Sequence, residues 1–333
     1  MRKKKILIIS IISKDIGFGH YSRCKNLNVQ LNRDFESKHI SFSGDLKKNF
    51  NLDKIYDYFH YNSFKKYNCV LIDISNKKIM SNKNFPKLKK TLIKISNKLF
   101  VIDSFGKFMI NNINGLTAKV IMVPYFFDKR KIIFKEKTKY LLGTKYFVLK
   151  PKIKKKSRSG KQFKNLLITC GGSDQLNFSY KVAKIALSLN KDLNLSILIG
   201  KLFNEKNILK IKRLKNEYPK NLKLHFNVNN IEKFYMLCDG AVSLSGLTKY
   251  ELIHYGTPSI IINQNTEQRK QNYFLEKKNM VMTLNDLKGN INFLKIKNFF
   301  SSYEYRNKLI SKGRNVVDGK AYQRIVRVIK DFF

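Results

Sequence analysis

A histidine that follows two closely spaced glycines is the residue best placed for chemistry in this chain. Gly17, Gly19 and His20 come soon after residues 6–12, an apolar and β-branched run that is typical of a buried parallel strand. Glycines let the backbone approach a ligand closely, and the peptide N–H groups at the start of the following helix form a natural anion site. Ligands bind at the carboxyl ends of parallel strands, so His20 is our candidate for proton transfer. The alternative is a tight turn that merely contains a histidine.

Two aspartates lie at the ends of later strand-like runs in the same half of the chain. Asp73 belongs to residues 69–74 and Asp103 to residues 99–104. In a parallel sheet both carboxylates would lie at the same edge as His20, where they could orient a ligand or the imidazole. The alternative for each aspartate is a helix N-cap or a turn.

A hydroxyl-rich turn in the second half offers an anion site. Residues 239–262 have the pattern of a strand, a turn, a short helix, another turn and a second strand. Ser245 and Gly246, at the predicted helix start, would present a hydroxyl, backbone N–H groups and the positive end of the helix dipole to a phosphate, without a metal. Glu251 follows at a distance that suits the hydroxyl pair of a ribose. The alternative is a capping box.

Strands and helices alternate along the chain, and the pattern starts twice. Residues 165–170 form a second apolar run, followed by a glycine turn at 171–174 and an amphipathic helix at 177–189. We expect residues 119–124 to be the last strand of the first half. The alternation predicts an α/β protein with two Rossmann-like, doubly wound domains that face a cleft. We place the domains at residues 1–152 and 153–333, and expect the last helical stretch to pack back on the first domain.

The composition fits a globular protein with an unusual charge. The 333 residues are 43% hydrophobic, and 67 Lys and Arg stand against 23 Asp and Glu. The lysines are dispersed along the chain rather than gathered on one face, so we expect no nucleic-acid partner. Residues 150–164 are a concentrated basic run, which we interpret as a solvated linker.

The cysteines and the N-terminus indicate a cytoplasmic protein. Cys24, Cys69, Cys170 and Cys238 lie far apart without the spacing of a metal site, and we expect free, buried thiols in a reducing compartment. Residues 1–12 imitate a signal peptide, but their apolar run is short and we expect a first strand. No stretch approaches the roughly 20 apolar residues of a membrane span, so any membrane contact should be peripheral.

Taken together, these stretches resemble the nucleotide-sugar hydrolases of the pseudaminic acid pathway. That family is similar to the glycosyltransferase that adds GlcNAc to lipid I and shares its GT-B architecture of two Rossmann domains. The resemblance covers nearly the whole chain. Its landmarks are Gly17-x-Gly19-His20-x-x-Arg23-Cys24, Asp73, Asp103, residues 143–151, residues 171–174, Ser245-Gly246 with Glu251, Gly256-x-Pro258, Gln268 and residues 318–320.

The resemblance implies that water attacks the anomeric carbon of a UDP-linked diacetamido-trideoxyhexose, releasing UDP with inversion and without a metal or cofactor. His20 would activate or position the water, and Ser245, Gly246 and Thr248 would hold the diphosphate. Glu251 and Gln268 would lie at the nucleotide or the sugar. The full set of substrate-binding residues that the resemblance implies is Gly17, Gly19, Arg23, Asp73, Gly172, Ser173, Ser243, Ser245, Gly246, Thr248, Glu251, Glu267 and Gln268.

Two positions differ from the family pattern. The family has a tyrosine close after the strand-end aspartate, whereas residues 73–76 contain none. The family also has an asparagine where this chain has Glu267, and Glu267-Gln268 looks more like the sugar-transferring members of the wider group. The alternative function is therefore an inverting glycosyltransferase of surface polysaccharide assembly, in which His20 would deprotonate an acceptor hydroxyl.

Overall fold

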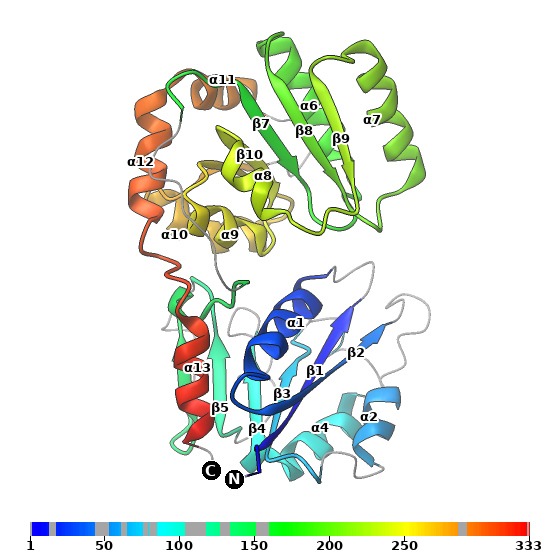
Figure 1. Ribbon diagram of the computed structural model, residues 1–333, viewed down its shortest axis with the longest axis vertical. Helices are drawn as coiled ribbons and strands as arrows, with labels where there is room; N and C mark the ends of the chain where they lie inside the picture. The colour runs from blue at the N-terminus through cyan, green and yellow to red at the C-terminus, as the bar shows by residue number, and fades with distance from the viewer. Residues whose placement is uncertain are drawn as a thin grey trace. The chain divides into compact units, whose positions relative to one another are not determined.

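The chain forms two compact units, each built on a parallel sheet (Figure 1). The computed structural model describes residues 2–12, 18–43, 53–60, 65–75, 79, 85–103, 118–126, 134–150, 160–285, 292–331 and 333. Unit 1 comprises Met1–Pro151 and Gly319–Phe333, and unit 2 comprises Lys152–Asp318. Each unit is described here by itself.

The sheet of unit 1 has six parallel strands in the order β2-β1-β3-β4-β5-β6. The four inner strands are apolar and buried because helices cover both faces of the sheet, whereas the residues of the two edge strands are mostly half-buried or exposed. The strands are β1 (Lys5–Ile12), β2 (Glu36–Ser43), β3 (Cys69–Asp73), β4 (Leu99–Ile102), β5 (Val120–Val123) and β6 (Lys139–Leu142).

Strand β6 corrects the sequence analysis, which ended the first sheet at residues 119–124. β6 pairs in parallel with β5 and extends the sheet by one strand. Only Leu141 of its four residues is buried, so this edge strand lacks the apolar run that marks the four inner strands.

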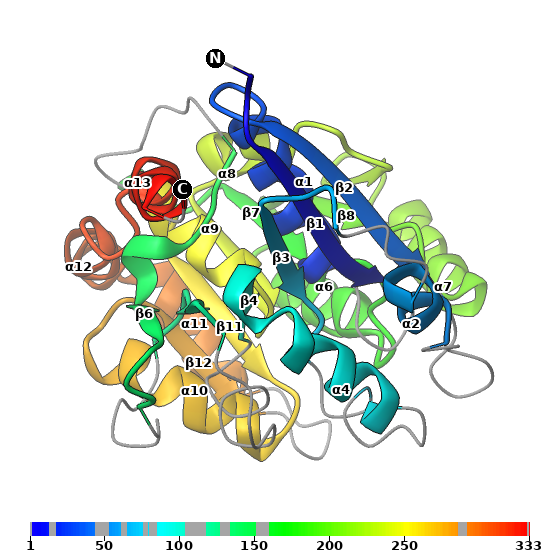
Figure 2. The same cartoon turned by 90° about the horizontal axis from the view of Figure 1, so that it is seen from below.

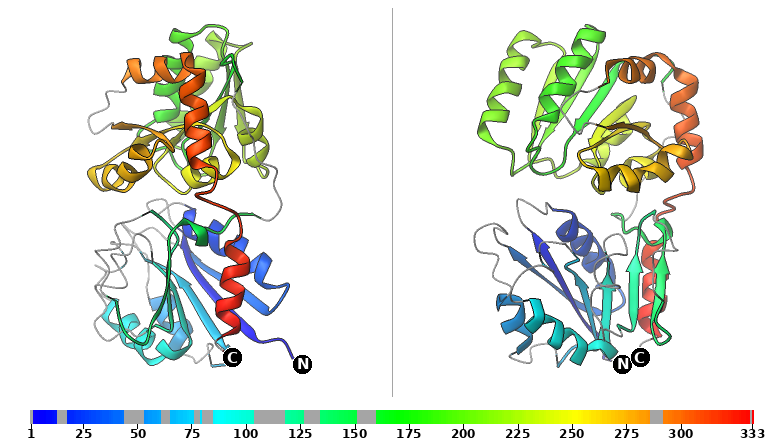
Figure 3. Two further views of the ribbon diagram at one scale, coloured as in Figure 1. Left: turned by 90° about the vertical axis from the view of Figure 1, so that its left-hand side faces the viewer. Right: turned by 180° about the vertical axis from the view of Figure 1, so that it is seen from behind.

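The α-helices described in unit 1 pack in two pairs. α1 (Gly19–Leu31) packs against α13 (Ala321–Lys330), and α2 (Asp53–His60) packs against α4 (Phe85–Lys94). Figure 2 shows the two pairs on opposite faces of the sheet. Among the described residues of this unit, Ser96–Lys98 (η1) and Thr144–Tyr146 (η3) are short 3-10 helices. Helix α13, the last of the chain, lies beside the β5 and β6 edge of this sheet and buries Ile325 and Ile329 in its core (Figure 3).

Unit 2 repeats the plan with the strand order β12-β11-β10-β7-β8-β9, again all parallel. Its strands are β7 (Asn165–Thr169), β8 (Asn194–Ile199), β9 (Leu222–Phe226), β10 (Gly240–Leu244), β11 (Ser259–Asn263) and β12 (Met282–Asn285). Its helices are α6 (Phe178–Leu189), α7 (Glu205–Glu217), α8 (Glu232–Leu237), α9 (Thr248–Tyr255), α10 (Thr266–Lys277), α11 (Phe293–Ser301) and α12 (Tyr303–Gly313). Gly256 ends α9 in the left-handed region, with φ of 68°.

The strand orders place a switch point in each unit. In unit 1 the chain leaves β1 in one direction to β2 and later returns to β3 on the other side of β1. In unit 2 the chain leaves β7 in one direction to β8 and later returns to β10 on the other side of β7. Ligands bind in open α/β sheets at the carboxyl ends of two such strands, because the loops there diverge. The loops after β1, β3, β7 and β10 are therefore the first places to look for a site.

Helix α13 should contribute to the stability of the fold. The Ile325 side chain is fully buried in the core of unit 1, whereas Gln323 on the same helix is exposed. We expect Ile325→Ala to lower the free energy of unfolding by about 2–5 kcal/mol, and Gln323→Ala to change it by less than about 0.5 kcal/mol. Urea denaturation of the two variants measures the difference, and equal midpoints would contradict the assignment of α13 to this core.

Candidate functional site

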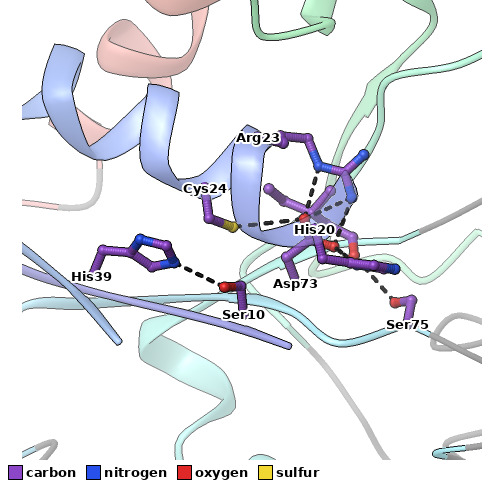
Figure 4. A network of polar contacts seen from close by, with 8 residues as sticks. Ser10, His20, Arg23, Cys24, His39, Asp73 and Ser75 are labelled. Atoms are coloured by element: carbon purple, nitrogen blue, oxygen red, sulfur yellow. Dashed lines mark hydrogen bonds and ion pairs between the residues drawn. The ribbon is translucent and has the colours of Figure 1, made fainter. Parts of the chain in front are cut away.

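His20 lies in the first turn of α1, at the switch point of unit 1. It is largely buried, with 8% of its surface exposed. Gly19 begins α1, and Gly17 lies outside the described residues. Figure 4 shows His20 and Arg23 on successive turns of α1, with Asp73 at the end of β3 between them and the sheet. The structure thus brings together three residues that the sequence analysis singled out separately.

The carboxylate of Asp73 joins the other two side chains. Its Oδ1 lies 2.6 Å from His20 Nδ1. Arg23 donates from Nε to Oδ2 and from Nη2 to Oδ1, each at 2.7 Å. The Cys24 thiol also donates to Oδ2, at 3.6 Å. Since the Asp73 side chain is fully buried, these contacts replace its entire hydration shell.

The pKa of Asp73 reflects this environment. Burial alone would raise it, but the positive charge of Arg23 and the hydrogen bonds from His20 and Arg23 hold the pKa below its ordinary value. Burial and the Asp73 charge raise the pKa of the Cys24 thiol well above its ordinary value, so Cys24 remains a neutral donor. The carboxylate is ionised, and the arginine and the thiol are fixed around it.

This arrangement prepares His20 for proton transfer. An ionised carboxylate only accepts hydrogen bonds, so Nδ1 carries a proton and Nε2 is the basic atom of the neutral ring. Within the described ranges, Nε2 has no hydrogen-bond partner. A base oriented by a buried carboxylate can take a proton at Nε2, and the carboxylate then stabilises the imidazolium.

Arg23 has a further donor available. Its side chain is 3% exposed, and Nη1 is buried without a hydrogen-bond partner among the residues that the structure describes. The guanidinium carbon also lies 5.4 Å from the centre of the Tyr125 ring, a cation–π distance. Asp73 therefore binds the Nε and Nη2 atoms of the guanidinium, and the Nη1 atom is available as a donor to a ligand.

His39, on β2, is a second histidine near this site that the sequence analysis did not consider. Its Nε2 lies 2.8 Å from Ser10 Oγ, and Ser10 is the direct neighbour of Asp73 in the register of β1 and β3. Burial lowers the pKa of His39, although the nearby Asp73 charge opposes this shift. Nothing in the sequence pattern relates residue 39 to residue 10. They meet because β1 pairs with β2, in a register that places His39 opposite Ile8, two residues from Ser10.

Asp103 occupies the end of β4, as expected from its position after an apolar run. It is fully buried, and its backbone N–H donates to the Met122 carbonyl at 2.8 Å. The ligand role considered for Asp103 stays a prediction.

In unit 2 the turn after β10 has the features of an anion site. Gly246 is exposed, and a Cβ atom placed there would meet nothing within 4 Å, so a ligand can approach the backbone. Thr248 begins α9, whose first-turn N–H groups have no acceptors within the helix. The Gly246 N–H itself donates to the Leu244 carbonyl at 2.7 Å. Since the Tyr250 N–H donates to the Leu247 carbonyl at 2.9 Å, the donors considered at this turn are the hydroxyls of Ser245 and Thr248 and the amides of residues 247–249.

A buried polar network lies beneath this turn, and the sequence analysis missed it. Asn272 of α10 donates from Nδ2 to Ser245 Oγ at 2.7 Å and to Asn263 Oδ1 at 2.5 Å. Lys249 Nζ donates to Asn272 Oδ1 at 2.7 Å and lies 3.5 Å from Ser245 Oγ. Asn263 in turn donates to Asn285 Oδ1 at 3.0 Å. Asparagines at the ends of both β11 and β12 were the available signal.

Glu251 is oriented by a buried tyrosine. The Tyr235 hydroxyl donates to Glu251 Oε2 at 2.8 Å, and Tyr235 is fully buried between α8 and α9. Burial, together with the Glu251 charge, raises the pKa of Tyr235 well above its ordinary value, so the tyrosine stays a donor. Glu251 is itself half-exposed, which leaves part of its carboxylate accessible.

The glycine turn after β7 is closely packed against the end of β8. Gly172 and Ser173 are half-buried, and the Gly172 carbonyl accepts from Leu202 N–H at 2.9 Å. A Cβ atom on Gly200 would lie 2.5 Å from that carbonyl oxygen, so residue 200 has room for glycine alone. Asp174 caps α6 by accepting from the N–H groups of Phe178 and Ser179, each at 2.8 Å.

The remaining predicted site residues have local contacts. Ser243 lies within β10, buried, and its hydroxyl donates to the Leu244 carbonyl at 3.2 Å. Gln268 Oε1 accepts from Gln264 N–H at 2.8 Å, which fixes the turn before α10. Glu267 belongs to α10, and its side chain lies outside the described part of the structure.

The cysteines, possible metal ligands and helix lengths bear on which further functions the described residues could support. All four cysteines are free and buried. Within the described residues, no group of three or more His, Cys, Asp and Glu side chains is arranged to hold a metal ion, and no helix has the length and apolar character needed to span a membrane.

Comparisons with known proteins support the architecture. The solved structure of Acinetobacter baumannii MurG aligns with a TM-score of 0.65 at 14% identity, covering 98% of this chain and 99% of that one. A Staphylococcus aureus MnaA structure with UDP aligns at 0.69 and 13% identity, covering 99% and 96%. The Neisseria meningitidis UDP-GlcNAc 2-epimerase bound to UDP-GlcNAc aligns at 0.64 and 14% identity, covering 98% and 100%. The fold is of the GT-B type.

Sequence relatives are more distant. No protein-family model matches the chain. It is 29% identical over 335 residues to the uncharacterized protein MJ1062 of Methanocaldococcus jannaschii, an alignment that covers 93% of this chain and 64% of MJ1062. It is 22% identical over 213 residues to the spore coat polysaccharide biosynthesis protein SpsG of Bacillus subtilis, with 62% of each chain covered. The alignments therefore span less than two thirds of the length of either relative.

Within this GT-B-type fold, the ion pair of unit 1 should be essential for stability. Asp73→Asn leaves the buried Arg23 charge uncompensated, and we expect the free energy of unfolding to fall by about 3–5 kcal/mol. Because the pKa of Asp73 is lowered in the folded state, its contribution is fully present above the ordinary aspartate pKa of about 3.9 and is lost as the pH falls through the folded value.

Denaturation curves of the two proteins between pH 3 and pH 7 measure this contribution. The difference in unfolding free energy between wild type and Asp73→Asn should shrink as the pH falls below about pH 4. A difference that does not change with pH would contradict the ionised carboxylate.

Proposed function

We propose that this protein is an enzyme that cleaves a UDP-sugar, and that its reaction is hydrolysis. The observation that carries the proposal is the His20–Asp73–Arg23 arrangement at the switch point of unit 1, which prepares a general base. The anion-binding turn of unit 2, at Ser245 to Thr248, supports the same conclusion because it suits a diphosphate leaving group. The solved GT-B-type structures that hold UDP or UDP-GlcNAc are consistent with such a ligand.

In the proposed reaction His20 Nε2 removes a proton from water as the oxygen attacks the anomeric carbon. Nδ1 keeps its proton on Asp73, whose carboxylate stabilises the imidazolium that forms. Arg23 holds the carboxylate in place and keeps it from taking the proton itself. Attack from the face opposite the departing diphosphate inverts the anomeric centre.

The leaving UDP gains negative charge as the glycosidic bond breaks. The Ser245 and Thr248 hydroxyls and the amides of residues 247–249 are fixed donors for that charge, and no metal is needed in this scheme. Glu251, oriented by Tyr235, suits the ribose hydroxyls. In this scheme unit 1 supplies the base and unit 2 binds the nucleotide.

The proposed substrate is a UDP-linked diacetamido-trideoxyhexose of nonulosonic acid biosynthesis. The order of the motifs along the chain, from Gly17-x-Gly19-His20 to Ser245-Gly246 and Glu251, supports this choice through the family resemblance. Gly172, Ser173, Ser243, Glu267 and Gln268 complete the proposed binding residues.

A second candidate is an inverting glycosyltransferase. The same base would then deprotonate the hydroxyl of an acceptor instead of water. The Glu267-Gln268 pair favours this candidate, as does the distant likeness to SpsG, whose name assigns it to spore coat polysaccharide biosynthesis.

A release assay with a panel of UDP-sugars tests the proposal. Purified protein is incubated with each sugar, without an acceptor and with EDTA present, and UDP release is followed. We expect release from a 2,4-diacetamido sugar, with His20→Ala at least about 100-fold slower because general-base catalysis contributes 10²–10⁴-fold. His39→Ala is the matched control, since His39 is bonded to Ser10 rather than to Asp73.

The outcomes separate the candidates. UDP release that His20→Ala abolishes and His39→Ala retains supports the hydrolase. Binding of an intact UDP-sugar that is consumed only when a sugar or lipid acceptor is added supports the transferase. The absence of any UDP-sugar binding would contradict both.

A further inference from the structure

Lys249 is a buried lysine without a counter-ion among the described residues. It is 2% exposed, in the first turn of α9 and next to the turn that we propose as the diphosphate site. Lysine is almost never fully buried unless it is paired with an opposite charge, because removing the ammonium from water is costly. The function proposed above assigns Lys249 no role.

The groups that face its Nζ atom are neutral. Asn272 Oδ1 comes from α10 at 2.7 Å, Ser245 Oγ from the turn after β10 at 3.5 Å, and the Tyr250 ring centre from α9 at 5.2 Å. The nearby titratable groups of α9 are bonded elsewhere: Glu251 accepts from Tyr235, and His254 lies 2.7 Å from the Val317 carbonyl. Burial lowers the pKa of Lys249 to about 7, and no charged group of the described structure contributes to that shift.

The network directs Ser245 toward a ligand. Ser245 Oγ accepts a hydrogen bond from Asn272 and faces the Lys249 donor, so its two acceptor positions are occupied. Its own O–H proton is then free to point toward an acceptor above the turn. An oxyanion bound by that hydroxyl would lie within a few ångströms of the Lys249 nitrogen, at a depth where charges are poorly screened.

We propose that Lys249 takes up a proton from solvent when a nucleoside diphosphate binds at the Ser245 turn, and that the resulting ammonium balances the charge of the diphosphate. This proposal rests on the proposed function, since it assumes a diphosphate at that turn. The bound diphosphate then acts as the counter-ion that the buried Lys249 lacks among the described residues. In the free protein the amine is largely neutral above pH 7, which explains how the lysine tolerates burial without a carboxylate.

Linkage fixes the direction of the effect. A bound diphosphate favours the charged amine and raises its pKa above the free value of about 7, so binding takes up protons between the two values. Affinity for UDP should therefore be highest below pH 7 and weaken as the pH rises. The second ionisation of a phosphate lies near pH 6, so above pH 7.5 the ligand itself hardly changes its charge.

Titration calorimetry of UDP at pH 8 in HEPES and in Tris tests the proposal. These buffers differ in ionisation enthalpy, so the difference between the observed binding enthalpies gives the number of protons taken up. We expect uptake of between one half and one proton for the wild type, and close to none for Lys249→Met. Between pH 7 and pH 9 the wild-type Kd should weaken by about tenfold relative to its change in the variant.

Two further variants control the experiment. Lys212→Met removes an exposed lysine of α7 by the same substitution, and its proton uptake should equal that of the wild type. Lys249→Arg keeps a permanent charge, so it should bind UDP without proton uptake. Thermal unfolding shows whether each variant is folded, and if Lys249→Met is not, the proton count of the wild type still decides the question.

The result distinguishes two failures. If the wild type does not bind UDP, the proposed function fails together with this inference. If UDP binds the wild type without proton uptake, or if Lys249→Met takes up as many protons as the wild type, the inference is wrong while the proposed function stands.

Discussion

The fully buried carboxylate of Asp73 is the constraint on which unit 1 depends. A charge in this position is tolerable only when every lone pair is used, and Arg23, His20 and Cys24 use them. All three come from the first two turns of α1, so the ion pair also fixes how that helix meets the end of β3. The switch point makes this contact possible, because α1 begins at the edge of the sheet at which β3 ends.

Unit 2 also has buried polar groups near its switch point, but most of them are neutral. Its sheet has the same parallel plan, but the polar groups at its switch point are amides and hydroxyls rather than an ion pair. Asn263, Asn272 and Asn285 form a neutral network, and each amide can both donate and accept. Such a network keeps Ser245 in one orientation without fixing a charge in the absence of ligand. The turn above it is then available to groups that bring a charge of their own.

The sequence was sufficient for the fold wherever strands are buried on both faces. Continuous apolar runs identified β1, β3, β4, β5 and β7, and the glycine turns after β1 and β7 marked where helices begin. Strand β6 was missed because one of its faces is exposed and only Leu141 is buried. For short edge strands the apolar signal is weak, and their pairing with a neighbour decides the structure.

The residues of the candidate site likewise include some that the sequence pattern identifies and some that only the packing of helices brings together. His20, Asp73 and Ser245 could be found because each lies at or soon after the end of an apolar run, and each parallel sheet places such positions at its carboxyl edge. The partners Lys249 and Asn272 could not be found, because they are 23 positions apart and meet through the packing of α9 and α10. Nor does the sequence distinguish a surface lysine from a buried one in a chain with so many.

The two switch points therefore differ in whether the protein itself supplies a counter-charge to the buried ionisable group. In unit 1 the charge of Asp73 is matched by Arg23 within the protein, so His20 gains orientation while the local charge stays constant. In unit 2 no carboxylate among the described residues matches Lys249, and its charge is free to respond to what binds. A base needs a fixed environment if it is to keep one tautomer, whereas an anion site gains from a charge that appears only with the anion. The same fold thus supplies both, by placing a carboxylate at one strand end and amides at the other.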